Sequence, residues 1–154
     1  MDTLSLDASI AITGISRSTL WRRVTDGTIG RGEKDGRSRA MLALGDVLAL
    51  VEVKLSAEDR AMLLRADAGD AQAQADMGAL FYVAGVHKAA LYWLQEAAAQ
   101  ENADAMQWLG TAYAGGGGVI PQDDNLAIMW LARAAALGHR IAAYQLEQLR
   151  AGCR

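Results

Sequence analysis

The chain has 154 residues, of which 52% are hydrophobic and 21% are charged, and its formal net charge is −3. This composition predicts a folded protein with one ordinary domain or two small ones, and it excludes an intrinsically disordered chain. The charge is uneven, because residues 1–45 carry seven Lys and Arg against five Asp and Glu, whereas residues 46–154 carry eight against thirteen. A head of +2 and a body of −5 indicate two parts with different roles.

Neither a secretory leader nor a membrane span is expected. No basic segment followed by an apolar one opens the chain, and no run of about 18 apolar residues occurs in it. The single cysteine, Cys153, can form no intramolecular disulfide, which favours a reducing compartment. We therefore expect a cytoplasmic protein without membrane contact.

Two short helices joined by a tight turn are predicted near the start of the chain. Ser5 can cap a helix over residues 6–12, residues 13–15 form a glycine-containing turn, and Ser16 can cap a second helix that ends near Thr25. Two short helices across such a turn make a helix-turn-helix, and in DNA-binding versions the second helix lies in the major groove.

The second helix has an inward and an outward side. Leu20 and Val24 are four residues apart and are predicted to face inward. Arginine on the outward side can hold a phosphate or bind a guanine edge with two hydrogen bonds. Trp21 has two open roles, stacking on the sugar-phosphate backbone or covering the base of the following wing. The candidate DNA contacts of this helix and its cap are Ser16, Arg17, Ser18, Trp21 and Arg22.

A basic hairpin is predicted after Gly27. Short strands around residues 28–30 and 39–42 would be joined by a polar, glycine-rich loop. Such a wing would stand beside the second helix and supply further candidate DNA contacts, namely Arg31, Lys34, Arg37 and Arg39.

Two more helices are predicted after the wing. The first starts at Gly45-Asp46 and covers residues 47–53, and the second is opened by a capping box at Ser56 and Asp59 and ends near Ala68.

The segment SLDASIAITGISRSTLWRRVTDGTI, together with the basic wing and LGDVLAL, resembles the MerR-like and excisionase-like winged helix-turn-helix domains over residues 3–54. The resemblance implies a DNA-binding domain at residues 1–54, followed by a connecting helix at residues 55–68. Seven basic against three acidic residues in positions 14–40 favour a nucleic-acid partner. The alternatives are a helix-turn-helix that serves only packing and arginines that form a solvated face.

The body of the chain repeats itself. Residues 71–81 match residues 103–113 at a spacing of 32, and residues 92–99 match residues 129–136 at a spacing of 37. An insertion at residues 115–122 accounts for the difference. Periods in this range indicate a helical solenoid.

Each copy has the pattern of a helix pair. Trp93 and Trp130 occupy equivalent positions in the second helices, and the alanines that follow each of them leave room for a large side chain to pack. A third, partial copy at residues 140–150 carries Glu147 and Arg150 in place of the glycine and the aromatic residue. These polar replacements predict a terminal capping helix.

The patterns A-x-A-x-x-x-L-G-x-x-Y, G-x-G-V-x-x-x-D and A-x-x-W-x-x-x-A-A-x-x-G occupy residues 103–113, 116–123 and 127–138. They resemble the Sel-one-like repeat, a relative of the tetratricopeptide repeat, over about residues 69–150. The resemblance implies a protein-binding solenoid at residues 69–154, with two repeats and a capping helix. The expected fold is therefore mainly α, with a small winged helix-turn-helix head joined to a short α-solenoid.

Trp108 and Tyr144 are candidate partner contacts, because equivalent first-helix positions often line the concave face of a solenoid. Burial inside the repeats is the alternative for both. His87 and His139 have no second ligand at metal spacing, so we expect no metal site. No phosphate loop, nucleophile with a neighbouring base or isolated carboxylate pair is found, and we therefore expect neither enzymatic activity nor a cofactor.

Taken together, these patterns predict a bacterial DNA-binding transcriptional regulator. Its head would bind double-stranded DNA, and its repeats would bind a protein or form a homodimer. The alternatives are a protein-interaction adaptor without DNA binding and an accessory factor in recombination or phage DNA handling.

Overall fold

The computed structural model describes residues 1–152, and the single cysteine at position 153 lies outside the described residues. The chain divides into two compact units, Met1–Ala68 and a second unit that begins at Gly69. Both units consist mainly of helices, so the expected mainly α fold is confirmed. None of the helices within residues 1–152 is long and apolar enough to cross a membrane.

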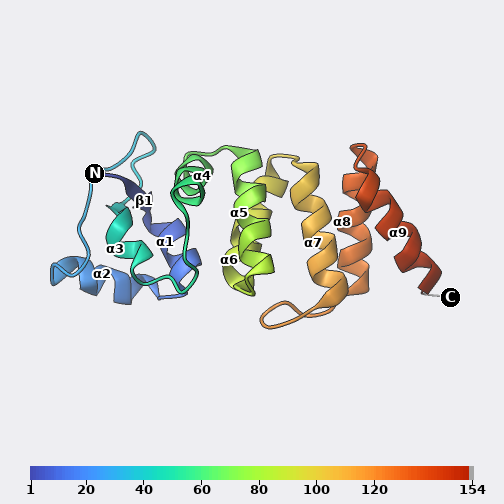
Figure 1. Cartoon of the computed structure of the whole chain (residues 1–154), viewed down its shortest axis with the longest axis horizontal. Coiled ribbons are helices and arrows are strands. Elements are labelled where there is room, and N and C mark those ends of the chain that lie inside the picture. The colour runs from blue at the N-terminus through green and yellow to red at the C-terminus, as the bar shows by residue number, and fades with distance from the viewer. Residues whose placement is uncertain (153–154) are drawn as a thin grey trace. The chain divides into compact units, whose positions relative to one another are not determined.

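The predicted helix-turn-helix pair is present in the N-terminal unit (Figure 1) as α1 (Leu6–Thr13) and α2 (Arg17–Thr25). The side chain of Ser5 caps α1 by accepting a hydrogen bond from the Ala8 amide, and Ser16 caps α2 in the same way from Thr19. Gly14 ends α1 in the left-handed conformation, with φ of 71°, which glycine adopts at little cost.

A two-stranded antiparallel sheet connects the chain start to the end of the wing. Strand β1 (Thr3–Ser5) pairs with β2 (Met41–Ala43), with Leu4 opposite Leu42. Both leucines are fully buried, and their burial is what stabilises so short a sheet.

The wing differs from the predicted hairpin between residues 28–30 and 39–42. Its first arm is an isolated bridge from Arg31 to Leu42, supported by hydrogen bonds that join Gly30 to Ala43 and Gly32 to Met41. This arm lies along one edge of β2, and the other edge of β2 pairs with β1. Strand β2 therefore lies one or two residues later than the strand predicted at residues 39–42, because the pairing register must place Leu42 in the core.

The helices after the wing are α3 (Leu44–Leu48) and α4 (Ala57–Asp67). The prediction of a helix over residues 47–53 was wrong in its bounds. Helix α3 starts directly after β2, and it ends where the amides of Leu50 and Val51 donate hydrogen bonds to carbonyls three residues earlier, as in a tightened last turn. The capping box that opens α4 is confirmed, with Ser56 and Asp59 each accepting from the other's backbone amide.

A buried carboxylate ties together three separate parts of the N-terminal unit. Asp67, at the end of α4, accepts hydrogen bonds from the backbone N–H and the hydroxyl of Ser5 at 2.7 and 2.6 Å. It also accepts a hydrogen bond from Arg39 Nη1 at 3.1 Å. The carboxylate thereby joins β1, the wing loop and α4.

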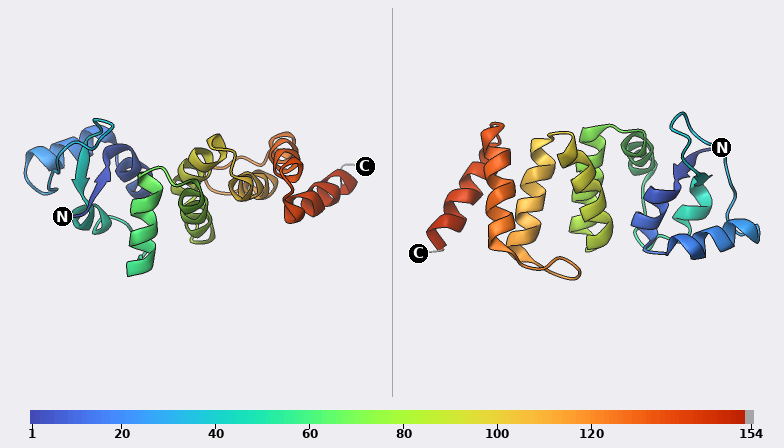
Figure 2. Two further views of the ribbon diagram at one scale, coloured as in Figure 1. Left: turned by 90° about the horizontal axis from the view of Figure 1, so that it is seen from above. Right: turned by 180° about the vertical axis from the view of Figure 1, so that it is seen from behind.

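The second unit is a stack of antiparallel helix pairs (Figures 1 and 2). Within it, α5 packs on α6, α7 on α8, and α8 on α9. The bounds are α5 (Ala71–Val83), α6 (His87–Ala99), α7 (Ala103–Gly115), α8 (Asp124–Ala136) and α9 (Arg140–Gly152).

Glycines in the first helix of each pair allow the two helices to approach closely. A Cβ atom at Gly78 would lie 2.6 Å from Leu94 Cγ, and one at Gly110 would lie 2.5 Å from Leu131 Cγ. Both leucines are fully or almost fully buried. The repeated glycine is therefore a packing requirement of the helix pair rather than a turn signal.

Candidate functional site

The outward side of α2 carries the first group of predicted DNA contacts. Ser16, Ser18 and Arg22 are exposed there, and Arg22 forms no salt bridge with any residue in the described range. Arg17 is also exposed but forms an ion pair with Asp7 of α1. An exposed pair of this kind contributes about 0–1 kcal/mol, so it holds Arg17 only weakly.

The wing reaches α2 through one arginine. The guanidinium of Arg31 lies over the indole ring of Trp21, 5.1 Å from the ring centroid, which is within the range of a cation–π contact. Trp21 is half-buried and supports the wing, while the guanidinium stays beside the exposed side of α2. The structure therefore brings Arg31 together with Trp21 of α2.

The other wing residues have different neighbours. Arg37 Nη2 donates to the Ala68 carbonyl at 2.7 Å, and Arg39 binds Asp35 and Asp67. These two arginines therefore hold the wing loop to the C-terminal end of α4 rather than lining α2. Lys34 is exposed.

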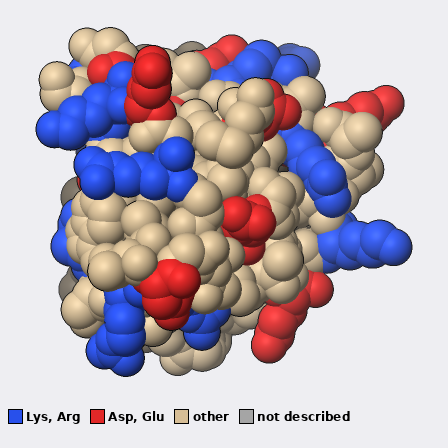
Figure 3. Space-filling view, turned by 90° about the vertical axis from the view of Figure 1, so that its left-hand side faces the viewer, with Lys and Arg blue, Asp and Glu red and all other residues tan. Residues whose placement is uncertain are grey.

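Charge on the surface is mixed. Figure 3 shows one face of the molecule on which Lys and Arg side chains alternate with Asp and Glu and with broad uncharged areas. The sequence predicted a basic head, but Arg17 and Arg39 pair with carboxylates of the same unit, and the face drawn in Figure 3 carries no continuous basic surface.

The wing loop contains a carboxyl whose pKa is lowered. Hydrogen bonds from the Arg39 backbone N–H, the Arg39 side chain and the Arg37 backbone N–H hold the pKa of Asp35 below its ordinary value. A lowered pKa stabilises the folded loop above the ordinary carboxyl pKa of about 4, and this contribution is lost as pH falls through the lowered value.

We expect the backbone amide resonances of Arg37 and Arg39 to shift with a common midpoint below the ordinary pKa of an Asp carboxyl in an NMR titration. The variant Asp35→Asn should abolish this transition while leaving the α1 amides unchanged. A midpoint at or above the ordinary Asp value would contradict the assignment.

In the repeats, the two predicted partner contacts lie in different settings. Trp108 is half-buried and packs against the core and against Tyr82, with ring centroids 5.7 Å apart. Tyr144 is 65% exposed and lines a hollow between α7, α8 and α9. Burial within the repeats therefore accounts for most of the Trp108 contacts, whereas the Tyr144 side chain is available to a partner.

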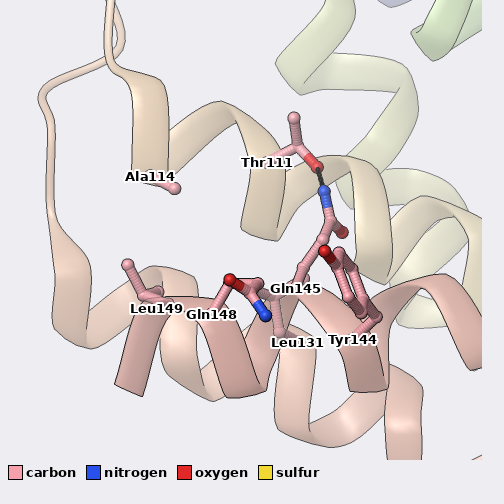
Figure 4. Close-up of a pocket in the computed structure, with 7 residues that line it drawn as sticks. All are labelled: Thr111, Ala114, Leu131, Tyr144, Gln145, Gln148 and Leu149. Carbon is pink, nitrogen blue, oxygen red and sulfur yellow. Dashed lines mark hydrogen bonds between the residues drawn. The ribbon is translucent and has the colours of Figure 1, made fainter. Parts of the chain in front are cut away.

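The hollow has a volume of about 350 Å³ (Figure 4). Its apolar part comes from the α7, α8 and α9 residues Ala114, Leu131 and Leu149, and its polar part from four side chains on α7 and α9. The complete lining is Thr111, Ala114, Leu131, Tyr144, Gln145, Gln148 and Leu149.

A glutamine network fixes one wall of this hollow, and sequence analysis missed it. The half-buried Gln145 accepts a hydrogen bond from Gln107 at 2.8 Å and donates one to Thr111 at 3.0 Å. Gln107 also donates to Thr111 at 3.0 Å. Gln107 and Gln145 are 38 positions apart, close to the repeat period, and this spacing is the signal that would have linked them.

The two histidines serve local structure. His139 Nδ1 accepts a hydrogen bond from the Ala142 amide at 3.1 Å, so the ring nitrogen that bears hydrogen is Nε2, which lies 2.9 Å from Asp104 Oδ1. His87 Nδ1 lies 3.0 Å from the Gly117 carbonyl. Among the described residues, no group of three His, Cys, Asp or Glu side chains could hold a metal ion.

The stacked helix pairs and the glycine at each close approach define an α-solenoid built from helix-pair repeats. Comparison with known families gives the particular repeat: residues 71–102 and 103–139 match the Sel1 repeat. Sel1 repeats imply a role in protein–protein interaction. No curated protein matches the chain.

Proposed function

We propose that this protein links duplex DNA to a protein partner, as a transcriptional regulator whose N-terminal unit binds DNA and whose repeats bind protein. The observation that supports DNA binding is the exposed side of α2, where Ser16, Ser18 and Arg22 face solvent and Arg31 of the wing lies over Trp21. Hydroxyl groups at a helix N-terminus and unpaired guanidinium groups are suited to phosphates and to guanine edges.

The proposal gives different roles to the remaining arginines. Arg17 would exchange Asp7 for a phosphate on binding, at little cost because the pair is exposed. Arg37 and Arg39 would act by positioning the wing, since their side chains already bind Ala68 and Asp67. Lys34 would supply a phosphate contact from the loop.

A single unit of this size would bury about 600–1,000 Å² on DNA, which gives weak binding by itself. The proposal therefore includes a homodimer or a second protein bound next to it. A twofold pair of units would reach half-sites about 34 Å apart. A recombination or phage DNA-handling factor would use the same contacts, and footprinting of the bound sites would separate it from a regulator of promoters.

The second candidate is an adaptor that does not bind DNA. It is favoured by the interspersed charges of Figure 3 and by the internal partners of Arg17, Arg37 and Arg39. In this case the exposed side of α2 would contact an acidic protein.

We expect Arg22→Ala to weaken binding to a fluorescent duplex about tenfold and to reduce the slope of log affinity against log salt by about one, because one phosphate contact is lost. Fluorescence anisotropy of the full chain across a salt series measures both quantities.

The matched control is Arg65→Ala, which removes the same charge from an exposed position on α4 and should leave the affinity within about twofold. Equal losses for the two variants would show that only net charge matters. No binding by the wild type at low salt, even at concentrations that permit dimerisation, would favour the adaptor.

A further inference from the structure

We propose that the hollow between α7, α8 and α9 binds an extended, uncharged peptide segment of a partner protein, anchored by one large apolar side chain such as leucine or phenylalanine. This inference rests on the protein-binding role of the repeats. It adds where on the repeats the partner binds and what chemistry is recognised there.

The lining determines the charge of the anchor. None of its seven residues is Asp, Glu, Lys, Arg or His. A charged side chain placed there would lose water without gaining an ionic partner, which disfavours its binding. An acidic segment is disfavoured further, since residues 46–154 carry thirteen acidic against eight basic residues. An uncharged apolar anchor avoids both costs.

The size of the hollow limits what can enter it. A volume of about 350 Å³ lies at the lower end of the range for ligand sites and suits one large side chain with part of its backbone. The apolar floor, made by Ala114, Leu131 and Leu149, would be removed from water by a leucine-sized group, which favours binding.

The rim offers hydrogen bonds to a peptide backbone. The Gln148 carboxamide and the Tyr144 hydroxyl are both on the exposed side of α9 and form no hydrogen bond with a residue in the described part of the chain. A carboxamide can donate to a peptide carbonyl and accept from a peptide N–H at once. These groups select an extended segment whose own backbone groups are free.

One polar wall of the hollow is already in place before binding. Gln145 and Thr111 are held by the hydrogen bonds to Gln107, so little side-chain entropy is lost there when a peptide binds. A preformed polar wall, a free polar rim and an apolar floor together form a site for one anchor residue and its flanking peptide bonds.

The test uses the full chain and a phage-displayed library of random short peptides. We expect the enriched peptides to share one large apolar residue flanked by uncharged positions. Ala114→Phe, which fills the hollow, and Gln148→Arg, which brings a guanidinium to its rim, should each weaken binding of a synthesised peptide about tenfold or more. Because residue 148 is exposed, the second variant will fold even if the first does not.

The control is Ala99→Phe, an equal enlargement at an exposed position of α6, which should leave peptide affinity unchanged. Enriched peptides that bind both hollow variants as tightly as the wild type would overturn this inference while leaving the protein-binding role intact. The same holds if Ala114→Phe dissociates a dimer in sedimentation, since a second copy would then occupy the hollow. Enrichment of no peptide at all would count against the protein-binding role itself.

Discussion

Replacement of Asp67 by alanine is expected to lower the free energy of unfolding of the N-terminal unit by about 3 kcal/mol. The residue is 6% exposed and its partner Ser5 is 1% exposed, so water cannot take the place of the carboxylate. The Ser5 N–H, the Ser5 hydroxyl and the Arg39 guanidinium would all lose an acceptor at once. Unsatisfied buried donors make this loss much larger than that of an exposed carboxylate.

Hydrogen exchange followed by mass spectrometry can assign the effect to one unit. Peptides from β1, α1 and α4 should lose protection in Asp67→Ala, while peptides from residues 71–139 should be unchanged. Asp2→Ala, at an exposed position in the same unit, is the control and should change stability by less than about 0.5 kcal/mol. Equal effects from the two variants would mean that the Asp67 contacts contribute no net stability.

The helix boundaries that sequence analysis predicted correctly depend on local chemistry. Three helices begin at a serine whose side chain accepts a hydrogen bond from the amide three residues later, namely Ser5, Ser16 and Ser56. At the third of these, the Asp59 side chain also accepts from the Ser56 amide. Such contacts are fixed by residue type and by spacing along the chain. The same holds for Gly14, whose left-handed conformation ends α1.

The contacts that sequence analysis missed join residues far apart in the chain. Ser5 and Asp67 are 62 positions apart, and Arg37 binds a carbonyl 31 positions away. No local pattern distinguishes an arginine that will bind an α4 carbonyl from one that will face solvent. Strand β1 was missed because three residues are too few to show the alternation of a strand.

The repeats were easier to predict, because a residue that recurs at the same position in both copies indicates a shared structural role. Equivalent positions such as Gly78 and Gly110 reveal a shared packing requirement even though neither contact can be read from one copy alone. Tyr144 was predicted as a partner contact from its place in the partial third copy, but the hollow itself was not predicted, because it forms only where α9 packs beside α7 and α8. The candidate partner site thus lies at the last, partial copy, where contacts between helices far apart in the chain decide which side chains line it.

Replacement of Gly110 by alanine is expected to destabilise the repeats by about 2 kcal/mol, although alanine favours helices over glycine by about 1 kcal/mol. The added Cβ would lie 2.5 Å from Leu131 Cγ and Cδ2 and 3.3 Å from the Ala127 carbonyl oxygen. Leu131 is 1% exposed, so it cannot move aside without disturbing the core, and α7 and α8 must separate. Urea unfolding followed by the fluorescence of Trp93, Trp108 and Trp130 measures the loss.

The control for this prediction is Gly45→Ala in α3, where nothing lies within 4 Å of the added Cβ. Without a clash, helix propensity alone acts there, and the variant should be neutral or slightly more stable. The double variant Gly110→Ala, Leu131→Ala should be less destabilised than the sum of its single changes, because the new methyl group enters space that the leucine vacated. Strict additivity would show that the glycine is present for a reason other than the close approach of the two helices.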